Sequence, residues 1–512
     1  MSKTVCPFLG FIKGDERIEK ACLLEKCQFF QTATTQCIFQ EISKASQEYL
    51  TSLKQLNEQN ELKMLSERAA DLSDSDRLER VSLCISNAQI AHVKGDLYRA
   101  LLEYRKGLIL DPTHPVIHQA MGDIYGLQGI FDEAISSYKR ALKRDPENGE
   151  VWIKLVLQYR AMYTNLPDKA SRFLELKDKL RASLHGLESQ SMAHAIMGHI
   201  HLILHSPIAE LFADERKEAM ARFEEALDIN PENLWAHLGI KDIHIYDAAY
   251  DRAVKQLHQA LNRISQSPRL FFELGECYLL SQVEHSMMSE AALQGAEESY
   301  QRALQLSAQY APAYFRLSFV NEQKANYDQA VEYYQKGLGF NPLNVFAHFR
   351  LGRIHLLNGM LDQASHRFKK VIELTRQHRT ENYQEGYIFN KLRFFKEANA
   401  LCAWIELGKI YTRKRLYSEA MEAYQNALAI DRNSPAAIIE QINLYRTQYQ
   451  DNRDRETLYD KIIDTYHSAA KLESQNPIAQ FCHAYACHTL LTEVSDKQED
   501  RREQAMNGYQ MA

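Results

Sequence analysis

One segment of the sequence repeats itself at a fixed distance, and this constrains the fold more than any other feature. Residues 312–342 read PAYFRLSFVNEQKANYDQAVEYYQKGLGFNP, and residues 343–374 copy their pattern at a shift of 34 residues. In this shift Ala330 corresponds to Ala364, and Tyr334 to Phe368. A fixed period of this length is typical of a stacked array of small structural units. It predicts helix pairs and a binding surface rather than a catalytic pocket.

The same arrangement recurs along most of the chain. A small residue is followed four positions later by an aromatic or large apolar residue, and three positions after that by a small or β-branched residue. Most steps between units are 34 residues, and extra residues precede the units at Ala296 and Ala420. We name these sets the signature triplets. They are Ala100/Tyr104/Gly107, Ala134/Tyr138/Ala141, Ala219/Phe223/Ala226, Ala253/Leu257/Ala260, Ala296/Tyr300/Ala303, Ala330/Tyr334/Gly337, Ala364/Phe368/Val371 and Ala420/Tyr424/Ala427.

The signature triplets resemble those of the tetratricopeptide repeat (TPR) family. Residues typical of the first helix of that family recur with them, as Trp152/Leu155/Tyr159, Trp235/Leu238/Gly239, Leu274/Gly275/Tyr278 and Trp404/Leu407/Gly408/Tyr411. The resemblance covers about residues 81–477. It implies an all-α fold, a right-handed α-solenoid of tandem helix-turn-helix units, with about nine to eleven units.

Elementary packing explains why these residue types recur. A single helix pair is too small to bury its own apolar face, so neighbouring units must cover it. Small residues such as Gly122 and Ala134 let two helices approach closely, and an aromatic such as Tyr138 fills the space between them. Proline stops a helix and redirects the chain. The prolines that do this here are Pro112, Pro146, Pro231 and Pro342.

The pattern divides the chain into four predicted parts. These are a Cys-rich segment (1–42), a helical connector (43–80), the repeat array (81–477), and a capping helix with a polar tail (478–512). We expect the tail from Ser495 to be disordered, because it is polar and terminal. Insertions interrupt the array near 160–218, 281–292 and 375–396, and the pattern fades after Asn433.

The charge balance excludes some classes of function. The chain holds 61 Lys and Arg residues against 67 Asp and Glu residues, a net charge of −6. A general nucleic-acid or membrane-surface binder normally carries a basic excess. The sequence shows no run of about 18 apolar residues that would span a membrane. The first residues do not read as a signal peptide, so we expect a cytoplasmic protein.

Four of the nine cysteines lie in the first 42 residues, at Cys6, Cys22, Cys27 and Cys37. A segment of this size is too small to fold on a hydrophobic core alone. Four thiolates binding Zn²⁺ or an iron–sulfur cluster would stabilise it, although the spacing matches none of the common runs. A redox-labile disulfide pair, or packing cysteines without a metal, are the alternatives.

The TPR resemblance implies a peptide-binding concave face, built mainly by the first helices. It predicts a partner protein or peptide, helical or extended, with apolar anchors and acidic flanks. The family's clamp for chaperone tails requires Lys and Asn at positions that here hold aromatic residues, so we do not predict that clamp. The alternative is that the aromatic residues pack in the interior. The residues predicted to point into the groove are Arg269, Phe272, Phe315, Phe319, Phe349, Arg353, Lys409 and Arg413.

Other motifs give weaker predictions. His194, His201 and His205 share one helical face, and the last two have the spacing of a metal pair. We interpret them as groove or core residues, and His483 and Cys487 as core residues. The sequence shows no phosphate-binding Gly-rich loop, no GxSxG motif and no kinase or Walker signature. We therefore predict that the protein is not an enzyme.

These observations lead to three hypotheses of function. The first is a scaffold or adaptor that holds a partner segment in the concave groove. The second is a metal- or redox-responsive regulator, in which the N-terminal cysteines gate that groove. The third is an accessory subunit of a larger complex. None of the three involves nucleic acid or a membrane span.

Overall fold

The structure is a computed structural model, in which helices account for nearly all of the described chain. It describes residues 30–31, 36–37, 59–69, 71–93, 95–163, 168–184, 190–205, 215–282, 289–377, 399–450, 453–472, 476–490 and 498–512. The predicted all-α solenoid of helical repeats is confirmed. Two short strands, β1 (Phe30–Gln31) and β2 (Gln36–Cys37), pair in antiparallel fashion. No helix among the described residues is long and apolar enough to cross a membrane.

The chain forms two compact units, which are described separately. One consists of residues 1–88 and 102–112, and the other of residues 89–101 and 113–512. The first contains the helix at 59–69 and most of α3 (Asp74–Val93) and α4 (Leu97–Leu110). Val81, Ala88 and Tyr104 are among its buried apolar residues, and Lys106 Nζ lies 2.7 Å from Glu61 Oε1.

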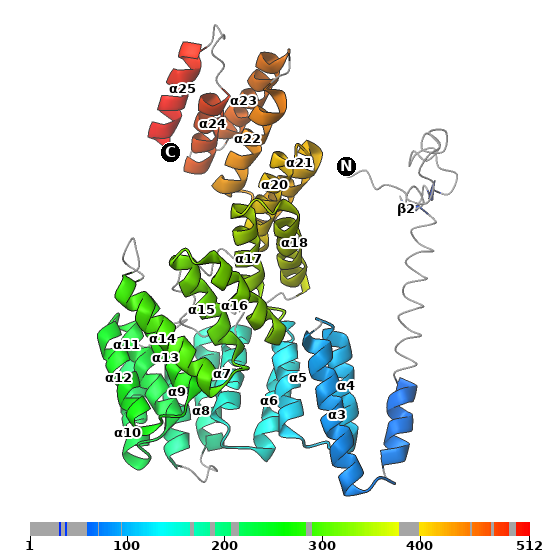
Figure 1. Ribbon diagram of the computed structural model, residues 1–512, viewed down its shortest axis with the longest axis vertical. Helices are drawn as coiled ribbons and strands as arrows, with labels where there is room; N and C mark the ends of the chain where they lie inside the picture. Colours follow the sequence, from blue (N-terminus) through cyan, green and yellow to red (C-terminus); the bar gives the residue numbers. More distant parts are fainter. Residues whose placement is uncertain are drawn as a thin grey trace. The chain divides into compact units, whose positions relative to one another are not determined.

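The second unit is built from successive helix pairs. Figure 1 shows neighbouring helices of the chain lying side by side, and the strongest packing is within pairs such as α5 with α6 and α15 with α16. The first helices are α5 (Pro115–Leu127), α7 (Gly149–Tyr163), α9 (Gln190–His205), α11 (Leu234–Tyr246), α13 (Pro268–Leu280), α15 (Ala311–Gln323), α17 (Val345–Leu357), α20 (Ala400–Arg413), α22 (Pro435–Tyr449) and α24 (Pro477–Thr489). The second helices are α6 (Phe131–Arg144), α8 (Lys169–Leu184), α10 (Glu215–Ile229), α12 (Tyr250–Arg263), α14 (Glu290–Leu306), α16 (Tyr327–Phe340), α18 (Leu361–Gln377), α21 (Tyr417–Ile430), α23 (Arg455–Leu472) and α25 (Gln498–Met511).

The signature triplets form the contact between the two helices of a pair. Ala134 and Tyr138 of α6 are buried, with exposed fractions of 0% and 1%. The ring of Tyr138 lies so close to Gly122 of α5 that a Cβ on this glycine would be 2.6 Å from Tyr138 Cε1. Only glycine permits this approach of helix to ring, so the predicted role of the small residues is confirmed.

A side-chain hydrogen bond fixes the entry into several first helices. Trp152 Nε1 donates to the Pro146 carbonyl oxygen at 2.8 Å, six residues upstream. Tyr314 donates its hydroxyl to Ala308 O at 3.1 Å, again six residues upstream. The ring Nε2 atoms of His237 and His348 lie 2.9 Å from the equivalent carbonyls of Pro231 and Pro342. Three different ring types therefore satisfy the same turn carbonyl.

The interior is a series of local clusters rather than one core. One cluster joins α13 to α17 and contains Phe315, Tyr334 and Phe346. The next joins α17 to α21 and contains Phe349, Phe368 and Leu407. Each helix pair therefore depends on its immediate neighbours, as in other repeat proteins.

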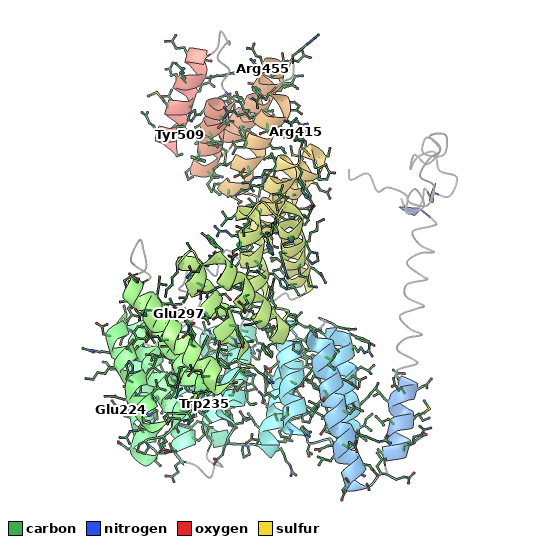
Figure 2. The ribbon with its side chains drawn as sticks, in the orientation of Figure 1. Glu224, Trp235, Glu297, Arg415, Arg455 and Tyr509 are labelled. Atoms are coloured by element: carbon green, nitrogen blue, oxygen red, sulfur yellow. The ribbon has the colours of Figure 1, made fainter. Side chains whose placement is uncertain are left out.

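The end of the chain differs from the prediction. We expected a disordered polar tail from Ser495, but residues 498–511 form the helix α25. Its residue Tyr509, labelled in Figure 2, contacts the Phe481 ring of α24 at a centroid distance of 5.8 Å. Ala505 is buried, and Gly508 lies directly against Ala484. The prediction of disorder is wrong because a few apolar residues on one face of a polar helix suffice to pack it onto α24.

Two of the predicted insertions fall partly outside the described residues. Residues 283–288, in the insertion near 281–292, are not described, and neither are residues 378–398, which cover most of the insertion near 375–396. The region near 160–218 contains α8, α9 and the start of α10, so helices continue through it.

Candidate functional site

The second unit contains a cavity of about 320 Å³ between its first helices. Residues of α5, α7, α9, α11 and α13 line it, and among the described residues Tyr138 of α6 is the one lining residue from a second helix. Its walls include Ile153, Leu157, Leu202 and Leu238, and ionised groups from several helices converge between them. A cavity of this size with apolar walls and a few polar groups is typical of a ligand site.

One ion-pair group of the cavity centres on Lys154 of α7. Lys154 Nζ lies 3.0 Å from Asp123 Oδ2 of α5 and 2.8 Å from Glu150 Oε1 on its own helix. Burial would lower the pKa of Lys154, but the two carboxylates raise it, so the ammonium stays charged. The one positive charge of Lys154 therefore faces two carboxylates, those of Asp123 and Glu150.

A second ion-pair group joins α11 to α13. Lys241 Nζ lies 2.7 Å from Glu273 Oε2 and 2.6 Å from Asp242 Oδ1, and Arg269 Nε lies 2.9 Å from Glu273 Oε1. Burial alone would raise the pKa of Glu273, but the two cations hold it at about 2. Glu273 is therefore ionised and fully engaged by the cations beside it.

Aromatic side chains fix one wall of the cavity. The Nε2 atom of His199 on α9 lies 2.9 Å from the carbonyl oxygen of Trp235. Trp235 is at the start of α11 and is labelled in Figure 2. The imidazole packs edge-on against Phe223 at a centroid distance of 4.9 Å. Burial lowers the pKa of His199 to about 4, so the ring is neutral at pH 7 and donates through Nε2.

Gln158 of α7 also lines the cavity, one turn after Lys154. Its side chain is buried, with 8% exposed. Its Oε1 has no hydrogen-bond partner among the residues that the structure describes. A buried carboxamide oxygen without a partner costs free energy, so this group is a strong candidate for contact with a ligand.

Successive first helices are connected by buried or partly buried tyrosine–carboxylate–cation groups, which we name the triads. In the first, Tyr138 donates its hydroxyl to Asp123 at 2.7 Å, and Asp123 pairs with Lys154 of the next unit. The other two triads are Tyr300–Glu276–Arg316 and Tyr334–Glu322–Arg350. In each, the signature tyrosine and the acid belong to one helix pair and the cation to the next.

The triads were not recognised in the sequence, although a signal was present. Arg316 and Arg350 are separated by the 34-residue period, within the repeated tripeptide Phe-Arg-Leu. A cation that recurs at an interior position, together with a buried tyrosine hydroxyl, requires a carboxylate nearby. This signal predicts a buried ion pair between units rather than a groove residue.

The structure places the four predicted groove phenylalanines in the core. Phe315 and Phe319 are each 1% exposed, Phe349 is 3% exposed and Phe272 is 7% exposed. Phe349 packs on Phe368, and Phe272 packs on Tyr300 and Tyr310. This agrees with the alternative interpretation, in which these aromatics pack inside, and it leaves little of their surface for a partner.

Of the eight predicted groove residues, only Arg269 lines the cavity. Lys409 pairs with Glu406 at 3.1 Å and lies 3.7 Å from Glu440 of α22. Arg353 on α17 is partly buried, and Arg413 at the end of α20 is exposed. The structure does not bring these three together with the cavity, and a role for them in partner binding stays a prediction.

Two histidines of α9 are engaged by carboxylates. His194 Nδ1 lies 2.7 Å from Glu225 Oε2, and His201 Nδ1 contacts Glu215. The side chain of His205 is outside the described residues. His483 Nε2 lies 3.4 Å from Cys487 Sγ, and both residues are buried, as predicted for core residues.

The cysteines of the predicted metal site lie almost entirely outside the described residues. Cys6, Cys22 and Cys27 lie outside the described residues, and only the backbone of Cys37 is described, in β2. Within the part of the chain that the structure does describe, no group of three or more His, Cys, Asp or Glu residues could hold a metal ion. The metal or cluster site at the N-terminal cysteines stays a prediction.

Three segments match the tetratricopeptide repeat family in sequence. They are residues 115–148, residues 311–342 and residues 403–436, which correspond to the α5/α6, α15/α16 and α20/α21 pairs. In these three segments the chain is similar to the tetratricopeptide repeat. The segment at 115–148 supplies Asp123, Gly126, Leu127 and Tyr138 to the cavity, so a segment that matches this family forms one of its sides.

Several solved structures are similar to parts of this chain. The crystal structure of MamA matches at 22% identity with a TM-score of 0.28, over 33% of this chain and 94% of that chain. YrrB, described as a TPR protein with an unusual peptide-binding site, matches at 18% identity with a TM-score of 0.31, over 42% of this chain and 95% of that one. The pilF protein of Pseudomonas aeruginosa matches at 17% identity with a TM-score of 0.31, over 48% and 90%. No curated protein sequence matches this chain.

Proposed function

We propose that this protein is an interaction scaffold or adaptor, which holds a segment of a partner protein in the cavity between its first helices. The observation that supports this proposal is the composition of the cavity walls. Five successive first helices contribute to them, and the walls contain both apolar and ionised side chains. Such walls suit a peptide segment, whose side chains are themselves apolar and polar in turn.

The proposal includes apolar anchors on the partner. Ile153 and Leu157 of α7 and Leu202 of α9 are cavity residues that an apolar partner side chain would contact. The ionised groups of the cavity pair with one another, which suits binding better than proton transfer. We propose that the protein is not an enzyme and that it is cytoplasmic. Membership of a larger complex is part of the same proposal.

A peptide library tests the scaffold proposal. The full-length protein would be panned against random dodecamer peptides, and the affinities of enriched peptides would be measured by fluorescence anisotropy. The double variant Ile153→Arg/Leu157→Arg places two bulky cations in the cavity and should abolish binding. The matched control is Ile229→Arg/Ile430→Arg, at helix ends where the side chains are 51% and 54% exposed. Failure to enrich any peptide, or equal binding by the blocked variant, would refute the proposal.

The N-terminal cysteines carry a separate proposal. Cys6, Cys22, Cys27 and Cys37 would hold Zn²⁺ or an iron–sulfur cluster, since four thiolates suit either. Metal analysis of protein purified without oxygen tests this, and absence of both zinc and iron would end it. If the cysteines also control access to the groove, Cys22→Ser should abolish peptide binding. If the protein is a scaffold without such control, the Cys22→Ser variant should still bind peptides.

A further inference from the structure

The cavity lining mixes carboxyl groups with cations. The carboxyl groups are those of Asp123, Glu150, Asp242 and Glu273, and the cations are Lys154, Lys241 and Arg269. Burial raises the pKa of Asp242, so the count of groups alone gives no excess of negative charge. The charge of the ligand is decided instead by which of these groups can still accept a partner.

The cations of the cavity are already engaged. Lys154 contacts two carboxylates, Lys241 contacts two, and Arg269 bonds to Glu273. An acidic ligand would have to break one of these pairs to find a partner. A basic ligand needs no such exchange, because Glu150 keeps 48% of its side chain exposed and contacts a lysine that it shares with Asp123.

The charge state of Glu150 suits this role. Burial raises its pKa, but Lys154 and, more weakly, Arg269 oppose that effect and bring the pKa below its usual value. Glu150 is therefore ionised at neutral pH. A carboxylate that is ionised and still accessible can accept further charge-assisted hydrogen bonds.

The walls beside Glu150 fit a long aliphatic stem. Ile153 and Leu157 follow Glu150 at three and seven positions on α7, so the three side chains share one face of that helix. Leu202 and Ile203 of α9 also line the cavity. Arg and Lys side chains place their methylene groups along apolar surface of this kind while the charged end reaches a polar group.

Gln158 supplies the remaining polar contact. Its buried carboxamide can both donate and accept, and a peptide backbone offers one N–H and one C=O per residue. An extended peptide leaves these backbone groups free, whereas a helix uses them internally. The unpartnered Oε1 therefore favours an extended ligand over a helical one.

We infer that the cavity binds an Arg or Lys side chain of an extended partner segment, with Glu150 as its ion-pair partner and Gln158 bound to the partner's backbone. This inference rests on the proposed scaffold function and names the chemistry of its ligand. It replaces, for this part of the groove, the acidic flanks predicted from the sequence.

The dodecamer library tests the inference with full-length protein. Enriched peptides should share one Arg or Lys in a common register. Replacing that residue by Glu in a synthetic copy should weaken binding by about a hundredfold, and replacing it by norleucine by about tenfold. Glu150→Gln should weaken binding of the basic peptide about tenfold and leave the norleucine peptide unchanged. Glu332→Gln on α16, an exposed carboxylate outside the cavity, is the matched control and should change neither.

Different failures have different meanings. If no peptide is enriched, the scaffold proposal itself fails. If enriched peptides bind in the cavity but are acidic or show no charge preference, the scaffold proposal stands and this inference is overturned. If they are basic but Glu150→Gln binds them normally, the ion pair has been assigned to the wrong carboxylate and the inference fails as stated. Gln158→Leu removes the carboxamide and should weaken the binding of all enriched peptides to the same extent. Unchanged binding by this variant would contradict the contact with the partner's backbone, and with it the preference for an extended ligand.

Discussion

Arg316 of α15 donates through Nε to Glu276 Oε1 of α13 at 3.1 Å, and the two side chains are only 2% and 3% exposed. Tyr300 donates to the same carboxylate, so Glu276 accepts from two buried donors. A carboxylate buried in this way is stable only while its partners are present. The pair therefore couples one helix pair to the next.

Replacing Arg316 by leucine should destabilise the array strongly. The change leaves Glu276 without its cation in a buried site, which costs about 3–5 kcal/mol in the free energy of unfolding. The measurement is urea unfolding followed by circular dichroism. Lys336→Leu is the control, because it removes an exposed i,i+4 pair with Glu332, and its urea midpoint should stay close to that of the parent chain. Equal effects of the two changes would contradict the assigned role of the triads.

His348 should make stability fall at acid pH. Burial first, and then nearby Arg367, lower its pKa to about 4 in the folded chain, against an ordinary value of 6.5. Between these values the unfolded chain binds a proton that the folded chain does not. The neutral His348 therefore stabilises the folded chain fully above pH 6.5. As the pH falls towards 4, the free energy of unfolding decreases by up to about 3 kcal/mol.

The variant His348→Trp isolates this effect. Trp152 shows that an indole N–H makes the same bond to the turn carbonyl, at 2.8 Å. The variant keeps a donor but cannot titrate, so its stability should depend less on pH between 6.5 and 4 than that of the parent chain. Urea midpoints at several pH values give the comparison. Parallel curves for the two proteins would show that His348 does not contribute.

Arg415 should be replaceable by glycine with a gain in stability. It lies in the turn after α20, labelled in Figure 2, with a φ of 59°, whereas Gly359 occupies the equivalent turn after α17 with a φ of 72°. A side chain in this left-handed region costs about 1 kcal/mol, and glycine removes that cost. Thermal unfolding of Arg415→Gly should show a higher midpoint. Gly359→Ala is the reverse control and should lower it; a lower midpoint for both would speak against backbone strain at Arg415.

Removing α25 should expose a thiol. Cys487 of α24 is 0% exposed, and burial raises its pKa to about 11. A chain ending at residue 497 lacks the helix that packs on α24, so Cys487 should become reactive towards an alkylating reagent at pH 8. Mass spectrometry of the labelled peptides measures this. Cys277 of α13, also 0% exposed, should remain unlabelled in both chains. Labelling of both cysteines would indicate general unfolding instead.

The repeat architecture could be predicted from sequence because its signals are local and periodic. Ala330, Tyr334 and their equivalents at the 34-residue shift are all fully buried, as their residue types indicated. The fate of Phe315 and Phe319 could not be predicted in the same way. Whether such a ring is interior or faces a groove depends on how closely neighbouring first helices approach, and this is set by contacts such as Arg350 with Glu322 that come from another unit.

The cavity was beyond sequence reasoning for a similar reason. Gln158, Glu150 and Lys241 are ordinary helix residues in the sequence, and no motif marks them. They become a site only because five first helices bring them around one space. Polar residues at such positions are informative only after their partners are known.

The triads also determine which helix pairs can follow one another. Arg316 and Arg350 occupy equivalent places in successive pairs, and each meets an acid of the pair before it. A duplicated copy of residues 311–344 would present an arginine to the existing Glu322 and a glutamate to the existing Arg350. Duplication of this helix pair could therefore lengthen the chain at this junction while every buried charge keeps a partner. Insertion of a helix pair without the matching arginine or glutamate would leave a buried carboxylate or guanidinium without one.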